Sequence, residues 1–225
     1  MTEIFEATED RAEHAAQILA DSFQDDPVWS WAFPDRPGRQ ALLPRFLLVH
    51  VHKALTNGRL LIAGDGLGAA TWHEVDDKDG HGDDSADAEM ASVYDPYLER
   101  LNTLGELMRA AHPSHTPHLY LSLIGVRPEA RGAGIGSALL RRGLTIPADT
   151  GGVPDQSREP ERAAYPAYLE ASSERNKPLY ERHGFRSLGD PIRIQNGPTL
   201  YPMWREPEHP EAEQPRQTNH LEGAI

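Results

Sequence analysis

Apolar residues recur every three or four positions in the first three of five stretches that predict helices. The predicted helices cover residues 8–22, 40–56, 96–111 and 174–183, and a turn followed by a helix is predicted over 132–146. Residues at their ends agree with this interpretation. Thr8 is a typical N-cap, Asn57-Gly58 is a typical stop, Pro96 suits a first helical turn, and Gly184 ends the last helix.

Shorter apolar runs bounded by turn residues predict strands. They cover residues 59–63, 67–73, 118–126, 167–171, 185–188 and 199–204. Gly64-Asp65-Gly66 separates the first two runs and indicates a hairpin. Residues 23–34 are predicted to form a loop that carries several aromatic side chains. Because helices and strands alternate, the pattern predicts the α/β (α+β) class, with a mixed sheet and helices on its faces.

Some segments lack the side chains of a core, which divides the chain into a domain and a tail. Residues 76–89 are acidic and predict a solvated loop, and residues 155–166 are charged, carry two prolines and predict an inserted loop. Pro147 predicts a kink or an early end to the preceding helix. We expect one domain over residues 1–205 and a disordered tail over 206–225, consistent with a mean hydropathy of −0.60.

Composition narrows the classes of function. A formal net charge of −13 over 225 residues argues against nucleic acid or an anionic membrane as partner. The chain has no cysteine, which excludes disulfides and thiolate zinc sites. No apolar run is long enough to span a bilayer, and the acidic N-terminus does not resemble a signal peptide. We therefore expect a cytoplasmic protein, either a monomer or a homodimer.

The most informative stretch is a predicted strand that runs into a glycine-rich loop and then a helix, over residues 118–146. Glycines let the loop turn tightly and let a ligand approach the backbone. Unpaired N–H groups at a helix start, together with the helix dipole, favour a pyrophosphate. Arg131 can add a charge-assisted contact.

Two other phosphate-binding motifs fit this loop poorly. A P-loop needs Gly-Lys-Ser/Thr, whereas Gly136 is followed directly by Ser137. A Rossmann fingerprint usually opens its fold and has an acidic residue about twenty positions later. Here the loop lies in the middle of the chain, and the proline-containing insert follows it.

Two motifs in order resemble the GNAT (GCN5-related) N-acetyltransferase family. Residues 131–136, Arg-Gly-Ala-Gly-Ile-Gly, resemble its Arg/Gln-x-x-Gly-x-Gly/Ala pattern for the CoA pyrophosphate. Residues 176–185, with the pattern Asn-x-x-x-Tyr-x-x-x-Gly-Phe, resemble its second motif. The resemblance covers roughly residues 5–204. Within the family, Asp26-Pro27 and Trp72 also resemble puromycin N-acetyltransferase and its actinobacterial relatives.

The resemblance implies a mixed, mostly antiparallel central sheet with flanking helices. It also implies that strands 118–126 and 167–171 splay apart around the pantetheine arm of acetyl-CoA, the acetyl donor. The implied cofactor-binding residues are Ile124, Gly125, Val126, Arg131, Gly132, Ala133, Gly134, Ile135, Gly136, Ser137, Asn176 and Tyr180. No metal is implied.

For catalysis, the resemblance implies that Tyr180 acts as a general acid toward the CoA thiolate. The same tyrosine could instead be an aromatic residue that packs its helix on the sheet. Glu170 is the first candidate for the base that deprotonates the acceptor amine, or it could anchor an ammonium as a fixed charge. His73 is the second candidate base, since its ordinary pKa is near 6.5.

The acceptor pocket is expected on the loop after the first helix. The candidate substrate-binding residues are Phe23, Asp26, Trp29, Trp31, Trp72 and His73. Aromatic walls beside an aspartate suit a flat cationic amine, although the same rings could simply pack two helices together. The other histidines show no metal-ligand spacing and are expected at the surface; they are His81, His112, His115 and His118.

Three functions stay open at this point. The first is acetyl transfer from acetyl-CoA to a primary amine of a small molecule, including an antibiotic or xenobiotic. The second is acetylation of a protein N-terminus or lysine. The third is a sensor domain that binds acyl-CoA without catalysis, for which an acid at position 180 would be unnecessary.

Overall fold

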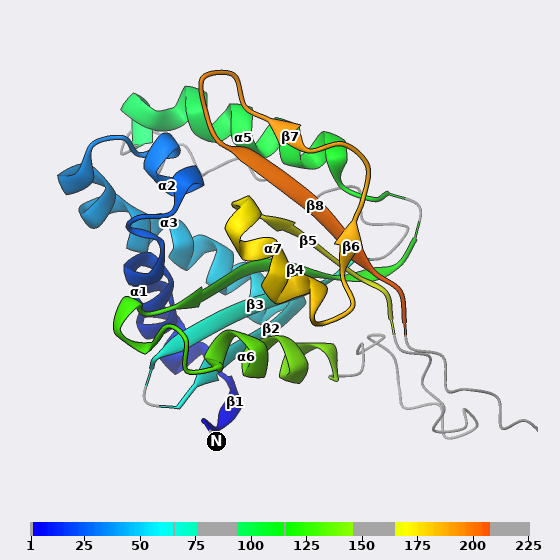
Figure 1. Cartoon of the computed structure of the whole chain (residues 1–225). Helices are drawn as coiled ribbons and strands as arrows, with labels where there is room; N and C mark the ends of the chain where they lie inside the picture. The colour runs from blue at the N-terminus through cyan, green and yellow to red at the C-terminus, as the bar shows by residue number, and fades with distance from the viewer. Residues whose placement is uncertain (1, 65, 76–93, 115, 146–164, 208–225) are drawn as a thin grey trace, which may run out of the picture.

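A mixed sheet organises the computed structural model, which describes residues 2–64, 66–75, 94–114, 116–145 and 165–207 (Figure 1). The strands lie in the order β1-β2-β3-β4-β5-β8-β6, and β7 pairs with β8 off this path. Their bounds are β1 Ile4–Ala7, β2 Gly58–Ala63, β3 Gly68–Val75, β4 His118–Val126, β5 Ala167–Ala171, β6 Arg186–Ser187, β7 Ile192–Arg193 and β8 Thr199–Arg205. Neighbouring strands are antiparallel except for β4 and β5, which are parallel. The expected mixed, mostly antiparallel sheet is confirmed.

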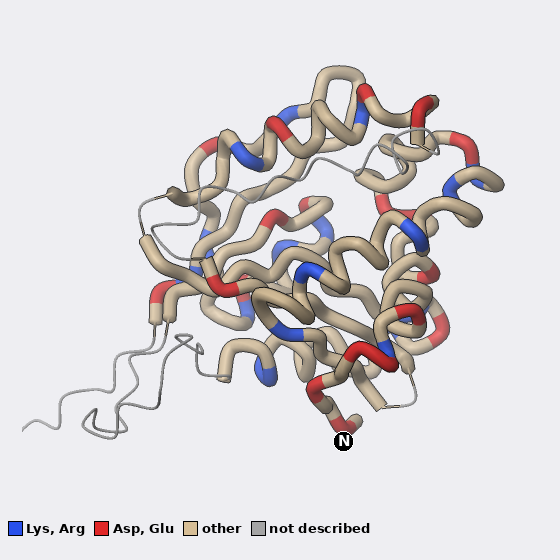
Figure 2. The backbone as a smooth tube through the Cα atoms, turned by 180° about the vertical axis from the view of Figure 1, so that it is seen from behind, with Lys and Arg blue, Asp and Glu red and all other residues tan. Residues whose placement is uncertain are grey.

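Helices cover both faces of this sheet (Figure 1). The α-helices are α1 Ala12–Phe23, α2 Pro27–Ala32, α3 Arg36–Asn57, α5 Leu98–Ala111, α6 Ile135–Leu144 and α7 Lys177–Glu181. Short 3-10 turns precede four of them, at η1 Glu9–Arg11, η2 Asp95–Tyr97, η3 Pro128–Ala130 and η4 Glu174–Asn176. Seen from behind, acidic and basic positions are interspersed along the chain (Figure 2).

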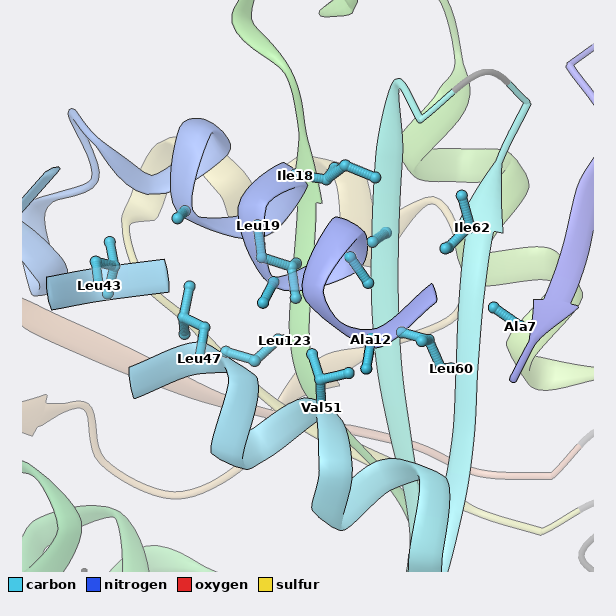
Figure 3. Close-up of a cluster of buried hydrophobic side chains, with 14 of the residues drawn as sticks. Ala7, Ala12, Ile18, Leu19, Leu43, Leu47, Val51, Leu60, Ile62 and Leu123 are labelled. Carbon is cyan, nitrogen blue, oxygen red and sulfur yellow. The ribbon is translucent and has the colours of Figure 1, made fainter. Parts of the chain in front are cut away.

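Alternation along the strands divides the core into two layers. On one face, Leu19 of α1 and Leu47 and Val51 of α3 pack with Leu60 of β2 and Leu123 of β4 (Figure 3). The opposite face packs against α6 and α7, and its buried members include Leu61, Trp72, Ile135, Leu139 and Tyr180. In each layer, the helices bury their apolar faces by packing against the sheet.

Most sequence-predicted elements lie where expected, and the strands at 118–126 and 167–171 agree with the structure residue for residue. Three elements were missed: β1, α2 and β7. The prediction of a loop over residues 23–34 was wrong, because Asp26 caps α2 and Pro27 occupies its first turn. A helix of six residues is too short to show a hydrophobic period, so only these end signals could have revealed it.

Helices α1 and α3 begin at residues other than those predicted. Thr8 precedes a 3-10 turn and its hydroxyl contacts Asp10 rather than a backbone N–H, so α1 begins only at Ala12. Helix α3 begins at Arg36, earlier than predicted, because the Asp35 carboxylate accepts a hydrogen bond from an N–H of the first turn. The acidic loop at 76–89, Pro147, most of the insert and most of the tail lie outside the described residues.

Trp72 is part of the core beneath α6. Its side chain is only 2% exposed and lies directly under Gly143 in the last turn of that helix. A Cβ atom at Gly143 would lie 2.2 Å from the indole ring, so this helix approaches the sheet closely only because the residue is glycine. In the part of the chain that the structure describes, no helix is both long and apolar enough to cross a membrane.

We expect Gly143→Ala to lower the free energy of unfolding by about 1–3 kcal/mol, because the added methyl group overlaps the Trp72 ring. Gly105 in α5 is the matched control, since a Cβ there meets nothing within 4 Å. Gly105→Ala should raise the free energy of unfolding by about 0.5–1 kcal/mol through helix propensity alone. Urea unfolding measures the free energy of unfolding of both variants. Equal effects of the two substitutions would contradict the close packing of α6.

Candidate active site

The parallel strands β4 and β5 part soon after they meet. In these two fully described strands, only Leu119–Ala167 and Tyr120–Tyr168 pair across the interface. Beyond them, β4 continues along β3 to Val126, while β5 continues along β8. The edge of β4 that faces β5 is therefore not covered by a neighbouring strand from residue 121 onward. Such an edge presents backbone N–H and C=O groups to an extended ligand.

A cavity of about 2500 Å³ opens at this gap. Its walls come from the α1–α2 corner, α3, α5, β4, β5, the start of α6 and α7. Binding sites for one small molecule usually occupy about 300–1000 Å³. The volume is therefore sufficient for two ligands side by side.

The glycine-rich loop lies at one end of the cavity, between η3 and α6. Gly132 and Gly134 have φ angles of 83° and 80°, a region that other residues rarely adopt, and a Cβ on either would meet nothing within 4 Å. Gly134 is the N-cap of α6 and offers no side chain to the N–H groups of the first turn. N–H groups at a helix start, together with the helix dipole, favour an anionic ligand. All predicted loop residues except Ala133 line the cavity.

Two contacts fix the surroundings of this loop. The Arg131 guanidinium donates a hydrogen bond of 2.8 Å to the carbonyl of Ser22, at the end of α1. Gly125 of β4 allows the same approach, because a Cβ there would lie 2.7 Å from the Cβ of Ser22. The Ser137 hydroxyl is 3.1 Å from Nε2 of His183, a contact that the sequence did not indicate. Burial and three nearby arginines lower the pKa of His183.

A chain of hydrogen bonds links three residues that line the cavity, Asn176, Ser172 and Asp26. The Asn176 amide donates to the Ser172 hydroxyl at 3.2 Å, and Ser172 donates to Asp26 Oδ2 at 2.5 Å. The other oxygen of Asp26 accepts from the N–H groups of Val28 and Trp29 and so caps α2. Burial raises the pKa of Asp26 in spite of these hydrogen bonds. Ser172 is a site residue that the sequence reasoning did not single out.

Tyr180 of α7 lies beside this chain of hydrogen bonds and lines the cavity. Its ring packs edge-on against Phe185, with centroids 6.2 Å apart, so the side chain is 6% exposed. Burial, and then the negative charge of Asp26, raise the pKa of Tyr180 above its ordinary value. The phenol therefore stays protonated near neutral pH and is able to donate a proton or a hydrogen bond.

Glu170 of β5 lines the cavity between the strands. The Tyr120 hydroxyl donates to its Oε2 at 2.9 Å, whereas its Oε1 is buried and has no hydrogen-bond partner among the described residues. Burial raises the pKa of Glu170 to about 7, more than the hydrogen bond from Tyr120 lowers it. The Tyr168 hydroxyl also favours the carboxylate, although it lies outside hydrogen-bond geometry.

His73 of β3 faces the same cavity. Its Nε2 is 2.9 Å from the Ser122 hydroxyl on β4, which in turn lies 2.8 Å from the Thr71 hydroxyl. The His73 ring is 6.2 Å from that of Tyr120, so both candidate bases lie near one tyrosine. The residues that the sequence proposed for catalysis, Tyr180, Glu170 and His73, all line this cavity.

A family model of the acetyltransferase (GNAT) domain matches residues 102–187, which include the parted strands, the glycine-rich loop and α7. The chain carries a GNAT acetyltransferase domain.

Solved structures share the fold of this GNAT domain beyond the matched residues. A protein from Corynebacterium glutamicum described as histone acetyltransferase HPA2 and related acetyltransferase is 26% identical, with a TM-score of 0.64, and the match covers 94% of this chain and 99% of that one. The polyamine N-acetyltransferase of Drosophila melanogaster is 16% identical, with a TM-score of 0.58 and coverages of 91% and 98%. Arylalkylamine N-acetyltransferase 2 of Aedes aegypti is 14% identical, with a TM-score of 0.57 and the same coverages.

The aromatic corner of the GNAT domain contributes fewer cavity residues than expected. Phe23, Trp29 and Asp26 line the cavity, but Trp31 and Trp72 do not. Trp31 turns toward α5, where Arg100 lies over its ring at 5.5 Å and donates to its backbone carbonyl. Trp72 points to the opposite face of the sheet from His73, because successive strand residues alternate. The structure therefore places neither of these two tryptophans, which the sequence assigned to the substrate pocket, on the wall of this cavity.

The expectation of surface histidines was also wrong for His118. This residue is 1% exposed, and its Nδ1 donates to the carbonyl of Thr116. Its Nε2 lies 3.0 Å from Nε2 of His112, at the end of α5. Hydrogen bonds to residues two and six positions earlier in the chain satisfy both ring nitrogens in this buried position. His81 and His115 lie outside the described residues. Among the residues that the structure describes, no group of three or more metal-ligating side chains occurs.

We expect Glu170→Gln to stabilise the fold at high pH. The pKa of Glu170 is about 7 in the folded state and ordinarily 4.5. Because the folded state binds the proton more tightly, the free energy of unfolding of the protein falls as pH rises through that window. Relative to wild type, the free energy of unfolding of the variant should be higher by on the order of 3 kcal/mol above pH 7 and by little near pH 4.5. Urea unfolding at pH 5 and pH 8 tests this, and an equal gain at both values would contradict the raised pKa.

Proposed function

We propose that this protein transfers an acetyl group from acetyl-CoA to a primary amine of a small molecule, by direct attack of the amine on the thioester. One observation carries the proposal. One cavity at the gap between β4 and β5 is lined by the start of α6, by Tyr180 and by Glu170. A long acyl donor and a short acceptor would meet at that gap.

The described residues fit the acyl donor. The uncovered edge of β4 from Ile124 to Val126 offers backbone partners for the amides of a pantetheine arm. The bare backbone at Gly132 and Gly134 leaves space for a pyrophosphate over the first turn of α6. Arg131 at the rim adds positive charge. When bound, the donor supplies an activated carbonyl carbon and a thiolate leaving group.

Glu170 and Tyr180 are suited to opposite proton transfers, with their pKa values set by burial. Glu170, with a pKa of about 7, takes a proton from the acceptor ammonium, so that the amine nitrogen has a free lone pair. The nitrogen–carbon bond forms and the carbon–sulfur bond breaks, and the nitrogen releases a second proton as it becomes an amide, which restores the proton that Tyr180 gives up. Tyr180, kept protonated by its raised pKa, donates a proton to the departing sulfur.

The acceptor side of the cavity is partly aromatic. Phe23, Trp29 and Phe46 line it. The centroid of the Trp29 ring lies 6.0 Å from that of Phe23 and 5.6 Å from that of Phe46. Such walls favour an amine with an apolar or flat body, including an antibiotic or xenobiotic amine. The neighbours that act on polyamines and arylalkylamines support a small-molecule acceptor.

Protein acetylation is the second candidate, and the name of the Corynebacterium glutamicum neighbour supports it. A panel of acceptors separates the two, with release of free thiol from acetyl-CoA as the measurement. The panel contains puromycin, an aminoglycoside, agmatine, spermidine, tryptamine and a lysine-containing histone peptide. Turnover of a small amine with little turnover of the peptide supports the proposal. Turnover of the peptide alone supports the second candidate, and binding of acetyl-CoA with no turnover supports a sensor.

We expect Tyr180→Phe to lower kcat by about 100-fold, because it removes the proton donor for the leaving sulfur. The affinity for acetyl-CoA should change little, because the acid acts during bond cleavage. Tyr201→Phe is the matched control. Tyr201 lies on β8, its ring contacts the ammonium of Lys177, and it does not line the cavity. Steady-state kinetics and calorimetry measure both variants. An unchanged kcat in Tyr180→Phe would remove Tyr180 from the mechanism.

We expect Gly134→Glu to weaken acetyl-CoA binding by about 100-fold or more, since a carboxylate would face the pyrophosphate at the start of α6. Gly189→Glu is the matched control. Gly189 also has a positive φ angle and open space around it, but it does not line the cavity. Calorimetric titration with CoA should show a loss only in Gly134→Glu. Equal affinities in the two variants would exclude this loop as the anion site.

A further inference from the structure

Glu170 rests against a wall of aromatic and imidazole side chains. This wall consists of Tyr120 and His118 from β4, Tyr168 from β5, His112 from the end of α5, and Trp204 from β8. Its members come from segments far apart in the sequence. None of the tyrosines in it was singled out by the sequence motifs.

Within this wall, Tyr120 makes the one direct hydrogen bond to the Glu170 carboxyl among the described residues, at 2.9 Å to Oε2. A phenol that donates to a carboxylate favours the charged form and restricts the rotation of the side chain. Oε1, in contrast, accepts no hydrogen bond from any residue that the structure describes. The geometry therefore holds one oxygen and leaves the other to accept a proton or a hydrogen bond from the acceptor amine.

Tyr120 is itself held from the side. The His112 ring stands edge-on to Tyr120, with centroids 4.7 Å apart at 90°, and edge-on to Tyr168, with centroids 4.8 Å apart at 72°. His112 is fixed in turn through His118, whose Nδ1 faces the carbonyl of Thr116. Because a carbonyl only accepts, His118 donates from Nδ1, and in its neutral form it accepts from Nε2–H of His112. This arrangement pins the Tyr120 ring and so its hydroxyl.

We propose that Tyr120 is a positioning residue, whose hydroxyl orients the Glu170 carboxyl and keeps it available as a base near neutral pH. The proposal rests on the proposed role of Glu170 in acetyl transfer. The titratable groups that face Glu170 are Tyr120 and Tyr168, with His112 and His118 behind them and His73 beside Tyr120. Of these, only the Tyr120 hydroxyl has hydrogen-bond geometry to the carboxyl.

The test compares Tyr120→Phe with Tyr168→Phe, which removes a neighbouring hydroxyl that makes no hydrogen bond to Glu170. The first readout is independent of activity: the pKa of Glu170 from a ¹³C carboxyl NMR titration, assigned with Glu170→Gln. Loss of the Tyr120 hydroxyl should raise this pKa by roughly one to two units, and loss of the Tyr168 hydroxyl should raise it less. Incorporation of 3-fluorotyrosine at position 120, a more acidic donor that keeps the ring, should lower it.

The second readout is the pH profile of kcat/KM with an acceptor found in the panel. In Tyr120→Phe the acidic limb should move to higher pH, so the loss relative to wild type is roughly tenfold larger at pH 6 than at pH 9. A merely structural role would lower kcat/KM by the same factor at every pH. That result, or an unmoved pKa of Glu170 in both Tyr120 variants, overturns the positioning role.

The two proposals fail in different ways. If the pKa of Glu170 moves in Tyr120→Phe and Glu170→Gln retains full activity, Tyr120 still positions the carboxyl but Glu170 is not the base. If the pKa does not move and Glu170→Gln is inactive, the function stands and the role of Tyr120 is wrong.

Discussion

The parting of β4 from β5 is the constraint on which the rest of the site depends. Parallel strands that paired along their whole length would consume the backbone groups of β4 and close the cavity. Here pairing stops after Tyr120, while each strand keeps an antiparallel partner on its other side. The sheet therefore remains continuous while its centre opens, and the opening lies directly beside the glycine-rich start of α6.

Contacts between distant segments then fix the walls of the opening. Asp26 caps α2 and also accepts from Ser172, which follows β5. Arg131 bonds the end of α1 from the other side. These contacts join the α1–α2 corner to the two GNAT motifs, so the position of α2 and that of α7 depend on each other.

Burial shifts the pKa values of Glu170 and Tyr180, two of the ionisable groups that line the cavity. It raises the pKa of Glu170 toward neutrality, where a carboxyl both accepts and releases a proton. It raises the pKa of Tyr180 further from neutrality, where a phenol stays protonated. One physical cause, the loss of hydration around the charged form, thus gives these two groups the protonation behaviour that the proposed base and acid require.

The sequence by itself determined the elements with a clear period and the motifs with local backbone chemistry. The strand at 118–126 and the loop at Gly132 and Gly134 were predictable because neighbouring residues decide them. Only the tertiary structure decided that Trp72 faces the core and that Tyr120 meets Glu170, fifty positions away. Side-chain direction and long-range contact depend on which strands pair and how closely helices approach, and no local pattern encodes those distances.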